Sequence, residues 1–301
     1  MEDESTFEGE LRTVRRERFS VSTRDAVRLA AWRYLPDGNP GRTGPPLLCL
    51  GSETGNAAEH HAFAIAVLNE PAPPRAVWTV DLRGRGQSEA GRIATSDLST
   101  DVEDLVDVTD ALTLHHLDVL ANGFSTVAVL KVLLKRPGLV RRMVMNDGAP
   151  ELDGVARANA AMRRAGRSAP TDGERTAGML RETTKGFEGL DEEGWNAMAE
   201  RLWRPGAKGW EPAHHPDLQR TTNAVSFDEA QPDGWNELPL LRRTPTLLLR
   251  AAGSNFVTDA IESRMRGALD RLEVQRVEGQ GHVPMLERGD LPARIATFLS
   301  H

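Results

Sequence analysis

The chain has 301 residues, with 37 basic and 44 acidic side chains and a formal net charge of −7 at pH 7. This acidic balance disfavours general electrostatic binding to nucleic acid or to an anionic membrane. One cysteine excludes an intrachain disulfide, the acidic start lacks the features of a signal peptide, and no apolar run is long enough to cross a membrane, so we expect a cytoplasmic protein.

Short apolar runs alternate with longer helical patterns along most of the chain. Strands are expected at residues 27–34, 46–50, 76–81, 118–122, 140–146, 245–250 and 272–277. Helices are expected at residues 58–68, 99–116, 125–136, 258–272 and 290–299. Such alternation is typical of strand–helix–strand units in a mainly parallel sheet, and it predicts an α/β fold.

The strand pattern stops after residue 150 and resumes at Thr246. The segment between them carries many charges, glycines and prolines, and it includes four tryptophans, namely Trp195, Trp203, Trp210 and Trp235. We expect residues 151–238 to form a helical lid on a core made of residues 1–150 and 239–301. Open α/β sheets bind ligands at the carboxyl ends of their strands, so the site is expected beneath this lid.

Several motifs resemble those of the α/β-hydrolase superfamily over nearly the whole chain. VDLRGRGQSEA at residues 80–90 is similar to the family's Asp-x-Arg-Gly-x-Gly-x-Ser turn. Residues 47–60 resemble the oxyanion loop region, and residues 117–147 resemble the nucleophile elbow with its flanking strands and helix. Residues 245–260 and 277–299 resemble the segments that carry the catalytic acid and histidine. The resemblance implies an eight-stranded, mainly parallel sheet with helices on both faces and an inserted helical lid.

The elbow departs from the family pattern. In Gly-x-Ser-x-Gly, a sharp turn between strand and helix presents a nucleophilic serine. Residues 121–125 read Ala-Asn-Gly-Phe-Ser, so Gly123 stands at the nucleophile position and has no side chain that can attack a substrate. Ser125 is expected in the first turn of the helix, packed toward the strand, and is not expected to replace the nucleophile.

Two further positions differ from the family, so the resemblance implies a degenerate triad. Asn255 stands where the family has its catalytic acid, and Gly51-Ser52 replace a His-Gly pair. The family's histidine is retained as His282, and we expect it to act as a general acid and base. The partner that orients His282 is either Asn255 or Asp147. Asp147 directly follows the strand that comes after the elbow helix, and the alternative for it is a structural role in that loop.

The backbone amides of Glu53 and Phe124 match the family's two oxyanion donors. The resemblance therefore implies an anion or enolate site that needs backbone groups alone. The Glu53 side chain is expected at the pocket mouth beside Ser52, where a carboxylate under an apolar lid would have a raised pKa and could act as acid or base. A solvated loop glutamate is the alternative.

The aromatic residues of the lid suit a flat apolar or aromatic ligand. The candidate substrate-binding residues are Ser52, Phe124, Phe187, Trp195, Trp203, Trp210, His214, His215 and Val283, although Trp195 and Trp203 also have the spacing of core residues. The adjacent histidine pairs lack the spacing of metal ligands, and the glycines of residues 83–87 do not form a dinucleotide fingerprint. We therefore expect no metal and no cofactor.

Three functions are compatible with these residues. The first is an enzyme without covalent catalysis that uses His282 on a small metabolite, as a cyclase, dehydratase, lyase, isomerase or direct-water hydrolase, with specialised metabolites such as polyketides as one substrate class. The second is a catalytically silent ligand-binding protein. The third is an ordinary esterase or epoxide hydrolase with another nucleophile. The sequence leaves the oligomeric state open, a homodimer included.

Overall fold

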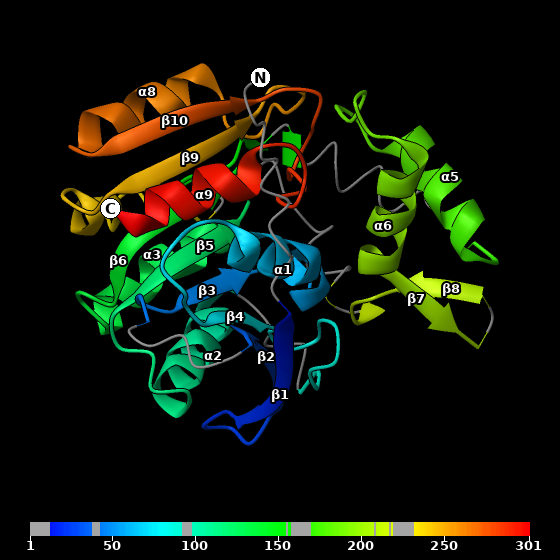
Figure 1. Cartoon of the computed structure of the whole chain (residues 1–301), viewed down its shortest axis with the longest axis horizontal. Helices are drawn as coiled ribbons and strands as arrows, with labels where there is room; N and C mark the ends of the chain where they lie inside the picture. Colours follow the sequence, from blue (N-terminus) through cyan, green and yellow to red (C-terminus); the bar gives the residue numbers. More distant parts are fainter. Residues whose placement is uncertain are drawn as a thin grey trace, which may run out of the picture.

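The computed structural model describes residues 13–37, 43–91, 98–154, 156–157, 170–207, 209–216, 218 and 232–301. Its centre is an eight-stranded sheet (Figure 1) whose strands lie side by side in the order β1 (Val14–Ser22), β2 (Arg28–Pro36), β4 (Val77–Val80), β3 (Leu47–Leu50), β5 (Leu117–Asn122), β6 (Val140–Asn146), β9 (Thr246–Ala251) and β10 (Leu272–Val277). β2 pairs antiparallel with β1 and with β4, and the other neighbours pair parallel. The predicted α/β fold with a mainly parallel eight-stranded sheet is confirmed.

Helices cover both faces of this sheet. On one face lie α2 (Leu98–Ala111), α3 (Ser125–Lys135) and α8 (Asp259–Ala268), and on the other lie α1 (His61–Asn69), which follows the short helix η1 (Ala57–His60), and α9 (Leu291–Ser300) (Figure 1). Side chains along β3 alternate between the two layers: Leu48 and Leu50 join the first apolar cluster, and Leu47 and Cys49 join the second. Successive side chains of a strand point to opposite faces, so each face has its own core.

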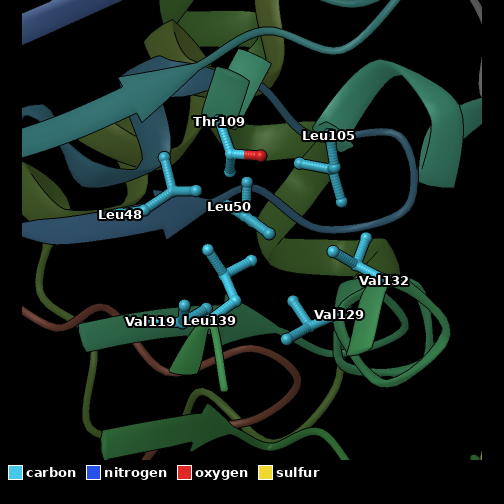
Figure 2. A pocket seen from close by; sticks show the side chains of 8 residues that line it. All are labelled: Leu48, Leu50, Leu105, Thr109, Val119, Val129, Val132 and Leu139. Carbon is cyan, nitrogen blue, oxygen red and sulfur yellow. The ribbon is translucent and has the colours of Figure 1, made fainter. Parts of the chain in front are cut away.

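A small void lies in the first of these layers. Figure 2 shows the side chains that line it, which are Leu48, Leu50, Leu105, Thr109, Val119, Val129, Val132 and Leu139. Its volume is about 10 Å³, roughly the room that one water molecule needs. The Thr109 hydroxyl already donates to the Val106 carbonyl at 2.9 Å. The void is therefore a packing gap of the core and is not a ligand site.

Two helices end earlier than the sequence pattern predicts. α2 ends at Ala111 and not at residue 116, and Thr113 just beyond it has a φ of +54°, which a helix does not accommodate. α8 ends at Ala268 and not at residue 272, because the chain extends there to form β10.

None of the helices in the described ranges is both long and apolar enough to cross a membrane.

Strand β1 is absent from the sequence-based prediction. It lies at the edge of the sheet, pairs with β2 alone, and has exposed or half-buried side chains at all but one position. An edge strand that buries little apolar surface shows no apolar run in its sequence. Because its residues are largely charged, β1 lacks the apolar pattern from which the other strands were predicted.

The chain between β6 and β9 carries further elements, called the insertion below. Its described elements are α5 (Gly173–Thr183), α6 (Glu192–Leu202), β7 (Trp203–Gly206) and β8 (Gly209–Pro212), which lie to one side of the sheet (Figure 1). The last two pair as an antiparallel hairpin, which corrects the expectation of helices alone. Proline and glycine in such short strands hide the strand pattern. Residues 158–169 and 219–231 of the expected lid lie outside the described residues.

Asp81 joins the turn after β4 to the segment after β3. Its carboxylate accepts the backbone N–H of Ala57 at 2.6 Å and that of Gln87 at 2.7 Å. Gly86 passes so close, at a φ of +52°, that a Cβ there would lie 2.1 Å from Asp81 Oδ2. The Asp-x-Arg-Gly-x-Gly motif therefore encodes a turn closed around a buried carboxylate. Burial raises the pKa of Asp81 to about 6, although the two N–H groups oppose that rise.

The raised pKa of Asp81 leads to a pH-dependent stability. Because the pKa in the folded chain is about 6, and about 4 in an unfolded chain, folding favours the protonated carboxyl. Its contribution is complete below about pH 4 and is lost as the pH rises through about 6. We expect the unfolding free energy of wild type, measured relative to Asp81→Asn by urea denaturation, to fall by about 2 to 3 kcal/mol over that window. A difference that does not change with pH would contradict this assignment.

Candidate active site

The chain turns sharply at Gly123, between β5 and α3. Gly123 has a φ of +51°, in the left-handed region that glycine adopts without steric cost. A side chain here would collide with the loop after β10: a Cβ would lie 2.8 Å from Cε1 and 2.9 Å from Nε2 of His282, and 3.5 Å from Cγ1 of Val283. The imidazole of His282 therefore rests directly on the glycine of the elbow.

Asp147 is the hydrogen-bond partner of His282. Their Oδ2 and Nδ1 atoms lie 2.8 Å apart, and Asp147 is fully buried just after β6. A carboxylate accepts this bond from Nδ1–H, and the neutral ring then offers Nε2 as an acceptor. The backbone of β9 holds Asp147 in turn: the Ala251 N–H donates to Oδ1 at 3.1 Å, and the Asp147 N–H donates to the Leu249 carbonyl at 2.7 Å.

Asn255, the other partner considered for His282, lies exposed in the loop after β9. No hydrogen bond joins it to His282 within the described part of the chain. Its neighbour Phe256 instead stacks on the imidazole, with ring centroids 3.8 Å apart and an angle of 15° between the rings. Phe256 is missing from the sequence-based predictions, because its position beside the ring depends on how the two loops approach each other. Stacking and the Asp147 bond together fix the plane of the imidazole.

The oxyanion loop lies beside the elbow. Leu50 at the end of β3 pairs with Ala121 of β5, so the two following turns start side by side. Neither the Glu53 nor the Phe124 backbone N–H donates to another group among the described residues. The Ser125 hydroxyl donates to the Gly51 carbonyl at 2.5 Å and is buried. Ser125 thus lies in the first turn of α3, as expected, and its hydroxyl is directed into the oxyanion loop after β3.

Glu53 is held by two arginines. Its carboxylate pairs with Arg157 of the insertion at 2.6 Å, and its carbonyl accepts Nε–H of Arg85 at 2.8 Å. The Arg157 guanidinium also lies over the ring of Phe124, 4.4 Å from its centroid. Arg85 is itself paired with Asp101 at the start of α2. We expected the Glu53 carboxylate to lie under an apolar lid. The structure corrects this, because the carboxylate belongs to an ion pair that joins the insertion to the oxyanion loop.

Three of the predicted substrate-binding aromatics belong to the core of the insertion. Phe187, Trp195 and Trp203 are buried in one cluster, to which Met285 from the loop after β10 contributes. Phe187 and Trp195 meet edge to face with centroids 6.0 Å apart. Trp210 is half-buried and packs against Gly173 of α5. These side chains hold the insertion together, so Trp195 and Trp203 are core residues, as their spacing had indicated, and Phe187 lies in the same core.

The insertion also reaches the β4 turn through its two adjacent histidines. The backbone of His214 forms a bridge with Arg85, and the His215 N–H donates to the Gly84 carbonyl at 2.7 Å. The side chain of His215 is exposed. Neither histidine contacts His282 in the part of the chain that the structure describes, so the structure does not join them to the candidate site. The described residues also contain no cluster of three His, Cys, Asp or Glu side chains that could hold a metal ion.

Sequence comparison identifies the family of this chain. The sequence profile of the alpha/beta hydrolase fold matches residues 45–289. The chain belongs to the α/β-hydrolase fold family. A comparison with curated proteins gave no significant match.

Solved structures of α/β hydrolases superpose on nearly the whole chain. An alpha/beta hydrolase from Novosphingobium aromaticivorans is 22% identical with a TM-score of 0.79, covering 94% of this chain and 98% of its own. E-2-(acetamidomethylene)succinate hydrolase is 18% identical with a TM-score of 0.72, covering 94% and 97%. The enol-lactonase from Burkholderia xenovorans is 15% identical with a TM-score of 0.68, covering 94% and 100%. At these identities the likeness establishes the shared fold alone.

The contact between Gly123 and His282 can be tested by adding a methyl group. Gly123→Ala puts a residue with a Cβ at positive φ, which costs about 1 to 2 kcal/mol, and also pushes that Cβ into the imidazole. We expect a larger loss of unfolding free energy than for Gly138→Ala, because Gly138 has a φ of +78° with no atom within 4 Å of its Cβ position. Overpacking adds about 1 kcal/mol or more. Chemical denaturation of both variants measures the difference. Equal losses of unfolding free energy would mean that the His282 side chain moves aside without cost.

His60 gives a second pH-dependent prediction. It is fully buried in η1. Burial lowers the pKa of His60, and the charge of Arg201 adds to this, while Glu59, the Leu50 backbone and Glu287 oppose it. The unfolded chain therefore binds a proton more readily, so stability is complete above about pH 6.5 and falls below it. Below about pH 6.5, the unfolding free energy of wild type, measured relative to His60→Leu by urea denaturation, should fall by about 1.4 kcal/mol for each unit by which the pH is lowered. Parallel pH curves for the two proteins would contradict this.

Proposed function

We propose that this protein is an enzyme of the α/β-hydrolase fold that works without a serine nucleophile. His282, oriented by Asp147, acts as general base and then as general acid on a small carbonyl compound, and the amides of Glu53 and Phe124 hold the oxyanion that develops. The single observation that carries this proposal is the position of His282 Nε2, 2.9 Å from where a Cβ on Gly123 would stand.

The surroundings of the elbow support a route without a covalent intermediate there. Gly123 has no side chain to be acylated, and the imidazole fills the space next to it. Ser125 is no substitute, because its buried hydroxyl donates to the Gly51 carbonyl. The Nε2 atom of His282 has no hydrogen-bond partner in the described residues, so it is available to a proton of water or substrate. The Asp147 carboxylate stabilises the imidazolium that then forms.

Hydrolysis by directly activated water fits these groups best. Nε2 removes a proton from water while the water oxygen attacks the carbonyl carbon, and the two backbone amides stabilise the resulting oxyanion. The carbonyl then re-forms, the bond to the leaving oxygen breaks, and the imidazolium returns its proton to that oxygen. Cyclisation, dehydration, lyase and isomerase reactions need the same proton transfer at a carbonyl compound and stay within the proposal.

The choice of carbonyl substrates draws support from fold relatives that include an enol-lactonase and a succinate-derivative hydrolase. Residues 151–238 act as the lid in this proposal, joined to the core by the Arg157–Glu53 pair. A flat aromatic ligand loses its main support, because Phe187, Trp195 and Trp203 are buried in the insertion. A polyketide-like substrate, a cytoplasmic location and a homodimer stay predictions from the sequence.

A ligand-binding protein without catalytic activity is the second candidate function. Gly123 favours it as well, because a family member that has lost its nucleophile can keep the fold and a binding site. The two candidates differ in what His282 does. In the enzyme its Nε2 moves a proton, whereas in a binding protein it is a contact group or a structural one.

The two functions are separated by testing wild type, His282→Ala and Asp147→Asn on aryl esters, enol lactones, thioesters and epoxides. We expect wild type to convert at least one class and His282→Ala to lose about 100- to 10,000-fold in kcat/KM. Asp147→Asn should lose activity in the same direction, because the wrong tautomer is favoured. The exposed histidine variant His116→Ala is the control and should keep its activity.

Intact-mass spectrometry during turnover, and after exposure to an organophosphonate, tests for a covalent intermediate. We expect no adduct at any time. A labelled serine would instead support an ordinary esterase. If wild type and His282→Ala bind the same ligands and convert none of them, the result would favour the ligand-binding function.

A further inference from the structure

A chain of hydrogen-bonded polar side chains, half-buried at Glu59 and fully buried at Asn146, runs beside the candidate site. It starts at Glu59, in the short helix η1. Its Oε2 accepts the Ser52 backbone N–H at 2.8 Å and Nδ2–H of Asn122 at 2.9 Å, while Oε1 accepts the Ser52 hydroxyl at 2.7 Å. The Glu59 carboxylate therefore joins the oxyanion loop to the last residue of β5.

The chain continues across the sheet. Oδ1 of Asn122 accepts Nδ2–H of Asn146 at 2.8 Å, and the same Nδ2 donates to the Pro284 carbonyl at 3.0 Å. Asn122 and Asn146 are paired in the register of β5 and β6, which brings their side chains together. Hydrogen bonds thus run from the segment after β3, across the ends of two strands, to the loop after β10.

The residues that Glu59 joins each lie one or two positions from a group of the candidate site. Ser52 precedes Glu53, Asn122 precedes the Gly123 elbow, Asn146 precedes Asp147, and Pro284 follows His282 and Val283. A movement of Glu59 would therefore be felt at the oxyanion amides, at the elbow and at both members of the His–Asp pair.

The surroundings leave this network little freedom. Asn122 and Asn146 are 2% and 0% exposed. A Cβ on Gly55 would lie 2.0 Å from Glu59 Oε1 and 2.5 Å from Ser52 Oγ, so the backbone packs tightly against the carboxylate. Buried polar groups without partners cost about 1 to 3 kcal/mol each, so the loss of one member leaves its neighbours unsatisfied.

We propose that Glu59 is a positioning residue that holds the oxyanion loop, the elbow and the loop of His282 in one arrangement. Glu59 is bonded directly to Ser52 of the oxyanion loop and to Asn122, and it acts on the elbow, on Asp147 and on the loop of His282 through Asn122 and Asn146. The inference rests on the proposed function, because the groups it positions are those of the proposed acid–base site. A displacement of about 1 Å in such a site costs about 100-fold in rate.

Two substitutions of Glu59 distinguish positioning from chemistry. Glu59→Met removes every acceptor, whereas Glu59→Gln keeps the pattern, because its amide oxygen accepts from Ser52 N–H and Asn122 and its amide nitrogen donates to the Ser52 hydroxyl. We expect kcat to fall about 10- to 100-fold for the methionine variant, with KM changed less than about threefold. The glutamine variant should stay within about threefold of wild type. If the glutamine variant is as inactive as the methionine variant, the carboxylate has a chemical role and positioning is overturned.

A second readout does not depend on turnover. In ¹H–¹⁵N spectra, Glu59→Met should shift the amides of Phe124 and Asp147 and the imidazole signals of His282, while Glu59→Gln leaves them close to wild type. Glu237→Met is the matched control, because Glu237 is a buried carboxylate bonded to Lys131 at 2.9 Å at the start of η3 (Leu238–Leu241), outside the network. Its shifts should stay local.

Confinement of the Glu59→Met shifts to the neighbours of residue 59 would overturn the inference, even in an active enzyme. If no substrate is converted, the proposed function fails, and the spectra still decide whether the network positions these groups. Should Glu59→Met not fold, Asn146→Ala breaks the same chain at its far end. That variant is then expected to shift the Glu53 and Phe124 amides, and unchanged amides there would overturn the inference.

Discussion

Asp147 is wholly buried at the carboxyl end of β6, and its two carboxylate oxygens join β9 to the loop that carries His282. The arrangement depends on parallel pairing, because the register of β6 with β9 puts the Asp147 backbone within reach of Leu249 and its carboxylate within reach of the Ala251 N–H. A buried carboxylate with these partners has little freedom to move. Together with the stacked ring of Phe256, this one residue sets the orientation of the imidazole and the direction of Nε2.

The elbow determines what that imidazole faces. Gly123 lets the ring of His282 come down onto the backbone, and Phe256 covers its plane. A glycine at residue 123 has no side chain that would keep the ring at a distance. The glycine and the close approach of the histidine are therefore one structural fact, and the proposed proton transfer rests on it.

Arginines link the outer parts of the molecule to this centre. Arg85 holds the oxyanion loop to the β4 turn and to α2, and Arg157 brings the insertion onto Glu53 and Phe124. Guanidinium groups suit this task because several donors in one plane can serve different segments at once. Charged contacts thus attach the insertion to the core, while its own aromatic cluster keeps it folded.

Seven strands and the main helices followed from apolar periodicity, since buried parallel strands and amphipathic helices leave patterns that survive in the sequence. β1 and the β7–β8 hairpin did not, because an edge strand and short strands with proline and glycine bury little apolar surface. The pairing of Glu53 with Arg157 also lay beyond reach, since it joins residues 104 positions apart.

The sequence by itself determined that residue 123 is a glycine and that a histidine stands at residue 282, because these are matters of residue identity. It left open whether Asn255 or Asp147 orients that histidine, and whether Asp147 has a structural role alone. Only the tertiary structure decided between them, placing Asp147 2.8 Å from the ring and Asn255 at the surface. A hydrogen bond depends on a few tenths of an ångström, and such distances are set by how strand ends and loops pack together, which no local pattern records.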